Sequence, residues 1–100
     1  MTIKLVKRPP DAAALRLEGR LDTTSAPAAQ EAFLKVAGEY AKIELDFTDL
    51  AYVSSAGLRA LLTLQKQVNR TGGSLVLTNV SPSIMEVFEM TGFSGILTIQ

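Results

Sequence analysis

Segments with alternating apolar residues are interleaved with segments whose apolar residues recur every three or four positions, and this interleaving constrains the fold most. Residues 42–47, KIELDF, alternate as in a strand with one buried face. After an expected connection at 48–53, leucines and a valine in 56–70 recur at helical spacing. Residues 74–78, SLVLT, return to a strand pattern. A strand, a helix and a second strand predict parallel strands joined by a right-handed crossover.

The N-terminal part of the chain predicts a β-hairpin. Residues 3–7, IKLVK, and residues 13–18 both read as short strands. The segment 8–11, which contains two prolines, predicts the turn between them. Gly19 is expected to end the second strand.

Two further helices and a last strand complete the pattern. Thr24 or Ser25 is suited to cap a helix with proline in its first turn. Serine and proline at 81–82 predict the start of another helix, which Gly92 ends. Residues 96–99 read as a final short strand.

The expected element order is therefore β-β-α-β-α-β-α-β, in one α/β domain over residues 1–100. The chain has 100 residues, a length typical of a single domain. Its strands alternate instead of forming continuous apolar runs, so we expect a mostly parallel, mixed sheet with helices mainly on one face.

The composition excludes most catalytic chemistry. The chain has no cysteine and no histidine, so it lacks thiolate and imidazole metal ligands and the usual base of serine hydrolases. Ten basic and ten acidic residues cancel, which gives no electrostatic reason to bind nucleic acid. No apolar run approaches the roughly 20 residues of a membrane span, and the N-terminus does not read as a signal peptide. We expect a cytoplasmic binding module that is not an enzyme, with no cofactor, metal or membrane.

Two adjacent serines, Ser54 and Ser55, precede the leucine-rich helix in the stretch YVSSAGLRALL. Either hydroxyl can cap the helix, and capping alone explains most serines before helices. The other interpretation is that one of these serines is phosphorylated, because the free N–H groups and the dipole of a helix N-terminus tolerate an anion. It would add about −1.5 to −2 charges to the surface.

Asp22, Asp46 and Asp49 are further candidates, since they stand in or beside loops at strand ends. They could form an acidic rim beside the serines, where open α/β sheets place ligand sites. Turn chemistry and a solvated strand face are the other explanation, and we favour it for Asp46 and Asp49.

The sequence resembles the STAS domain family, in particular the small bacterial anti-sigma factor antagonists. The resemblance rests on GRLDTTSA at 19–26, ELDFTDLAYVSSAGLRALL at 44–62, GGSLVLTNVSPSIMEVFEMTGF at 72–93 and the closing ILTI. These pieces occur in the family's order and cover nearly the whole chain.

The resemblance implies a phospho-regulated binding module. Family members of this type bind an anti-sigma factor, a GHKL-type serine kinase, when they are unphosphorylated. The kinase phosphorylates one serine and releases them, and a PP2C-type phosphatase restores them. The alternative is a STAS domain that serves, without phosphorylation, as a fixed scaffold in a transporter-associated or lipid-trafficking complex.

The family's motif places the phosphoacceptor on Ser55. Ser54 stands where many members have aspartate, so it is the second choice. Asp22 matches the aspartate of the family's Gly-x-Leu-Asp loop, which lies close to the acceptor. We expect a monomer whose partner-binding residues surround the acceptor: Asp22, Thr23, Ser54, Ala56, Gly57 and Arg59.

Overall fold

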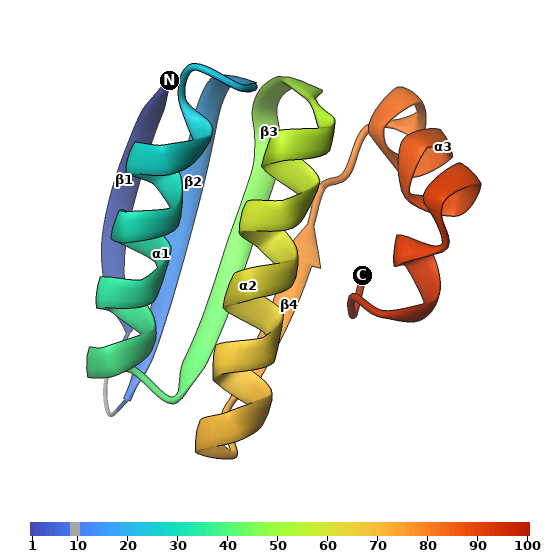
Figure 1. Cartoon of the computed structure of the whole chain (residues 1–100). Coiled ribbons are helices and arrows are strands. Elements are labelled where there is room, and N and C mark those ends of the chain that lie inside the picture. The colour runs from blue at the N-terminus through green and yellow to red at the C-terminus, as the bar shows by residue number, and fades with distance from the viewer. Residues whose placement is uncertain (9–10) are drawn as a thin grey trace.

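The strands form one four-stranded sheet in chain order within residues 1–8 and 11–100, the part of the chain that the computed structural model describes (Figure 1). Strands β1 (Thr2–Arg8) and β2 (Ala12–Leu21) pair antiparallel. This pairing confirms the hairpin, although its predicted turn contains residues 9–10, which lie outside the described residues.

Strands β3 (Lys42–Val53) and β4 (Ser74–Thr78) extend the sheet by parallel pairing, as the crossover pattern predicts. Strand β3 includes the segment 48–53, which the sequence predicted as a connection. Strand β2 also passes through Gly19, which was expected to end it. Gly19 has φ +98°, and the register between β2 and β3 shifts on either side of it. Irregular pairing hides the strict alternation by which a strand is recognised in a sequence.

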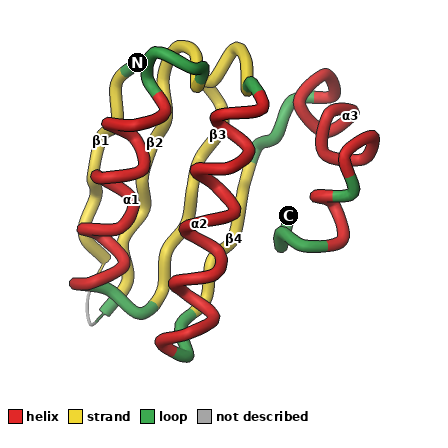
Figure 2. Tube along the Cα trace, in the orientation of Figure 1, coloured by secondary structure: helices red, strands yellow, loops and turns green. Residues whose placement is uncertain are grey.

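Helices α1 (Ala26–Glu39) and α2 (Ser55–Thr71) lie side by side on one face of the sheet (Figures 1 and 2). Helix α3 (Pro82–Thr91) lies beyond β4 and joins the core through Phe88, whose ring meets that of Phe47 edge-on at 6.2 Å. The helices are therefore mainly on one face, as expected. No helix within the described residues combines the length and the hydropathy that crossing a bilayer requires.

The helix ends follow the predicted chemistry at most positions. Gly72 and Gly92 end α2 and α3 with φ of 75° and 81°. Ser81 Oγ accepts a hydrogen bond from the N–H of Ile84 at the start of α3. The exception is α1, where Ser25 stands at the N-cap but makes no side-chain capping bond.

The predicted strand at residues 96–99 is wrong. A 3-10 helix, η1 (Phe93–Gly95), and a turn occupy the chain up to Leu97. Only an isolated bridge between Leu77 and Ile99 joins this segment to β4.

Candidate functional site

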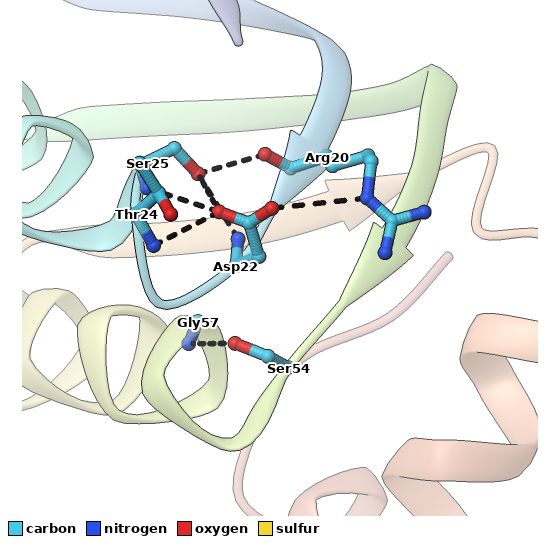
Figure 3. Close-up of polar contacts among 6 residues, drawn as sticks. All are labelled: Arg20, Asp22, Thr24, Ser25, Ser54 and Gly57. Carbon is cyan, nitrogen blue, oxygen red and sulfur yellow. Dashed lines mark hydrogen bonds and ion pairs between the residues drawn. The ribbon is translucent and has the colours of Figure 1, made fainter.

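The C-terminal ends of β2 and β3 bring the loop before α1 next to the start of α2. The N–H of Ser54 donates to the carbonyl oxygen of Leu21 at 2.9 Å. Parallel strands end at the same edge of a sheet, so the residues that follow them share one surface. Figure 3 shows the polar contacts of this region.

The two serines have different surroundings. Ser54 is half-buried, and its Oγ accepts a hydrogen bond from the N–H of Gly57 at 3.2 Å (Figure 3). Ser55 is the first residue of α2 and is exposed. Its hydroxyl makes no hydrogen bond with any described residue. Capping therefore occupies the Ser54 hydroxyl and leaves the Ser55 hydroxyl accessible.

Asp22 organises the loop that leads into α1. Its Oδ1 accepts hydrogen bonds from the N–H groups of Thr24 and Ser25, both at 3.0 Å (Figure 3). Ser25 Oγ donates to the carbonyl oxygen of Arg20 at 2.7 Å instead of capping α1. The carboxylate of Asp22 thus holds the backbone of the loop before α1, and the predicted Ser25 side-chain cap does not form.

These contacts also lower the pKa of Asp22. The hydrogen bond from the backbone of Ser25 is the largest cause, and it outweighs the opposing effect of desolvation. The Ser25 hydroxyl, the N–H of Thr24 and the positive charge of Arg20 lower the pKa further. A carboxylate in this state is a weaker base than an ordinary aspartate.

Arg20 and Tyr52 belong to the site, and the sequence reasoning missed them. The guanidinium carbon of Arg20 lies 4.3 Å from the centre of the Tyr52 ring. Arg20 Nε also lies 3.7 Å from Asp22 Oδ2 (Figure 3). The two residues are paired across β2 and β3, and this pairing depends on the part of β3 that was taken for a connection. Arg20 helps to orient Asp22.

Three of the predicted partner-binding residues line one groove. Thr23 stands in the loop before α1, while Ala56 and Arg59 come from the first turns of α2. The groove lies between the starts of the two helices and has a volume of about 440 Å³. The residues that line it are Thr23, Ala26, Pro27, Gln30, Ala56 and Arg59.

Gly57 is not part of the accessible surface. It is buried, and a Cβ added to it would lie 2.6 Å from the carbonyl oxygen of Leu21. The glycine lets the first turn of α2 approach the end of β2. Gly57 therefore positions the start of α2, and its contact with a partner stays a prediction.

Asp46 and Asp49 are engaged on the sheet itself. Asp46 Oδ1 accepts hydrogen bonds from Thr48 and Asn79, and Asp49 forms a 2.7 Å ion pair with Arg16. Burial by itself would raise the pKa of Asp46, but the bonds from Thr48 and Asn79 and the charge of Arg16 lower it overall. These contacts agree with turn chemistry at Asp46 and a solvated strand face at Asp49, the explanation favoured from the sequence.

The site presents an accessible hydroxyl on Ser55, and no carboxylate of the described residues is hydrogen-bonded to it. The chain has no histidine, and Asp22 binds its own loop and Arg20.

Known proteins match the chain along nearly all of its length. A family model described as the STAS domain matches residues 4–100. The anti-sigma-B factor antagonist of Bacillus subtilis (strain 168) is 32% identical over 85 residues, which are 85% of this chain and 78% of that protein.

Solved structures share the fold at low sequence identity. SpoIIAA of Bacillus, an anti-sigma factor antagonist, matches in its unphosphorylated and phosphorylated forms with TM-scores of 0.78 and 0.77, both at 21% identity. These matches cover 99% of this chain and 87% and 91% of those chains. An anti-sigma factor antagonist from Mycobacterium paratuberculosis matches with a TM-score of 0.86 at 17% identity, over 98% of this chain and 83% of that one.

Proposed function

This chain belongs to the STAS domain family, and we propose that it acts as an anti-sigma factor antagonist that phosphorylation of Ser55 switches off. The observation that carries the proposal is the division of roles between the two serines. The Ser54 hydroxyl caps α2, whereas Ser55 is exposed at the start of the same helix. The names of the relatives, one of which is known in both phosphorylation states, support this assignment.

The phosphoryl group comes from ATP bound to the partner, a GHKL-type serine kinase. Ser55 Oγ attacks the γ-phosphorus, so that a new O–P bond forms while the bond to the β-phosphate oxygen breaks. ADP leaves, and the hydroxyl proton passes to a base on the kinase, since this chain offers none beside Ser55. A PP2C-type phosphatase reverses the modification by hydrolysis. The antagonist itself is a monomeric substrate and binding module, not an enzyme.

Partner binding and phosphorylation use the same surface. The kinase must bring its nucleotide to Ser55, so it covers the start of α2 and the groove lined by Thr23, Ala56 and Arg59. A phosphate there adds about −1.5 to −2 charges inside the contact. Like charges at an interface cost several kcal/mol, and every 1.4 kcal/mol is tenfold in affinity, so a loss of about a hundredfold or more needs no change of fold.

Site mapping tests the proposal. The chain is incubated with a GHKL anti-sigma kinase and Mg-ATP, and the phosphopeptide is identified by mass spectrometry. We expect phosphate on Ser55 in the wild type and in Ser54→Ala, and none in Ser55→Ala. Phosphate on Ser54 alone would overturn the assignment. An unmodified chain that still binds a partner would favour the scaffold alternative.

Binding titrations test the switch. Ser55→Ala is expected to bind the kinase as the wild type does and to stay bound when ATP is added. Ser55→Asp is expected to weaken binding only in part, because it has one charge and a shorter reach than a phosphate. Equal affinity of Ser55→Asp, phosphorylated wild type and unmodified wild type would contradict an electrostatic switch.

Asp22→Ala tests the contribution of the loop before α1. We expect weaker binding or slower phosphorylation, because the loop that presents Thr23 loses the hydrogen bonds from Thr24 and Ser25. Asp11→Ala is the matched control, since this exposed aspartate precedes β2 at the opposite end of the strand. If the two substitutions affect binding and phosphorylation equally, Asp22 does not contribute to the partner-binding surface.

A further inference from the structure

Arg59 is a cation without a partner beside the proposed phosphoacceptor. It is exposed on α2, and its guanidinium makes no ion pair and no hydrogen bond with the described residues, where only its carbonyl oxygen accepts a bond, from Thr63. Its side chain forms part of the wall of the groove between α1 and α2. Arg20, the other arginine at this end of the sheet, is held by Asp22 and by the ring of Tyr52.

Ser55 and Arg59 are four residues apart on the same helix. Side chains at this spacing lie one above the other, with about 5–6 Å between their Cβ atoms. An acidic group four residues before a basic one is the favourable order for a pair on a helix. This spacing puts a phosphate on Ser55 within reach of the Arg59 guanidinium, whose planar array of donors matches phosphate oxygens.

We propose that Arg59 is the in-chain partner of the phosphate on Ser55, an inference that rests on the proposed phosphorylation. The unmodified surface offers the kinase a free guanidinium in the groove. After phosphorylation the same guanidinium binds the phosphate. Phosphorylation therefore has two effects. It adds negative charge, and it pairs the Arg59 guanidinium, which is then no longer available to an acidic group of the kinase.

The test is the second ionisation of the phosphate, measured by ³¹P NMR on the full chain with phosphoserine incorporated at position 55 during translation. The phosphate pKa is near 6 without perturbation, and a neighbouring guanidinium lowers it by favouring the dianion. Arg59→Gln should raise the phosphate pKa by about 0.3 at 0.15 M salt, the size expected from an exposed pair at this spacing. Arg59→Lys keeps the charge and should retain most of the lowering.

Lys66→Gln is the matched control. Lys66 is exposed on the same helix, and the substitution removes the same charge. It lies eleven residues after Ser55, about 16 Å along the axis, which is twice the Debye length of about 8 Å at this salt concentration. We expect it to change the phosphate pKa by less than about 0.1.

The result that supports the proposal is a rise in the phosphate pKa in Arg59→Gln that Lys66→Gln does not share and that about 1 M salt abolishes. Equal phosphate pKa values in Arg59→Gln and Lys66→Gln would overturn it. Because phosphoserine is built into the chain, this result does not depend on any kinase. If a kinase leaves Ser55 unmodified, the proposed function fails while the titration still decides whether Arg59 binds a phosphate at that position.

Discussion

At Gly57 the absence of a side chain decides how closely α2 approaches β2. A Cβ there would lie 2.6 Å from the carbonyl oxygen and 2.8 Å from Cγ of Leu21, and 3.1 Å from Cγ1 of Val53. Contacts of this kind can be relieved only by moving the helix or the strand. We expect Gly57→Ala to lower the free energy of unfolding by about 1–3 kcal/mol, the usual effect of overpacking.

Gly38→Ala is the control for this prediction and has the opposite expected sign. Gly38 lies in α1, and nothing stands within 4 Å of a Cβ built on it. Alanine in a helix is favoured over glycine by about 0.5–1 kcal/mol. Urea unfolding measures the change in the free energy of unfolding for both variants. If Gly57→Ala leaves this free energy unchanged, α2 does not pack tightly against Leu21.

The carboxylate of Asp22 gives the stability a defined dependence on pH. Its pKa in the folded chain is lowered from 3.8, chiefly by the hydrogen bond from the backbone of Ser25. A lowered pKa contributes stability that is complete above 3.8 and is lost as the pH falls through the folded value. Asp22→Asn should therefore be less stable than the wild type at pH 7 and approach it as the pH falls below 3.8. Urea midpoints across this range measure the difference, and a constant difference would exclude ionisation as its cause.

At the scale of the element, α2 starts where it does because a tertiary contact and a local cap act at the same residue. The N–H of Ser54 binds Leu21, while its Oγ accepts the N–H of Gly57. The helix then buries a continuous apolar face: Gly57, Leu58, Ala60, Leu61, Leu64 and Val68. The start of the helix is thus held to the sheet independently of Ser55.

Ser54→Ala and Ser55→Ala should therefore differ in stability. Loss of a serine cap costs about 0.5–2 kcal/mol, so Ser54→Ala should lower the free energy of unfolding by about 1 kcal/mol. Ser55→Ala removes an exposed hydroxyl without a hydrogen bond and should stay within about 0.5 kcal/mol of the wild type. Thermal unfolding of the two variants is the measurement. A larger loss of stability in Ser55→Ala than in Ser54→Ala would show that Ser55, not Ser54, caps the helix.

At the scale of the whole molecule, phosphorylation is expected to leave the fold unchanged. The phosphate stands on the surface, whereas the core is held by buried residues such as Phe33, Phe47 and Phe88. An amide NMR comparison of the phosphorylated and unmodified chains should show shifts confined to the loop before α1 and the first turns of α2. Widespread shifts in β1 or α3 would show that the switch is conformational.

Several features were determined by the sequence alone because they depend on residues that are close along the chain. Alternating apolar residues indicated every strand of the sheet, and helical spacing together with capping residues indicated all three described α-helices. Serine before proline at 81–82 and the glycine at 92 placed the ends of one helix, since capping and left-handed φ angles are local properties. The resemblance to the STAS family directed attention to Ser54 and Ser55.

Only the tertiary structure decided which serine caps α2 and which stays exposed. The roles of the two serines depend on where β3 ends, at Val53, and on the hydrogen bond from the N–H of Ser54 to the carbonyl oxygen of Leu21. These two residues are 33 positions apart in the sequence. The pairing of Arg20 with Tyr52 and the small size required at Gly57 depend on the same alignment of β2 with β3. These features arise from hydrogen bonds and steric contacts between distant segments, and periodicity within one segment carries no information about them.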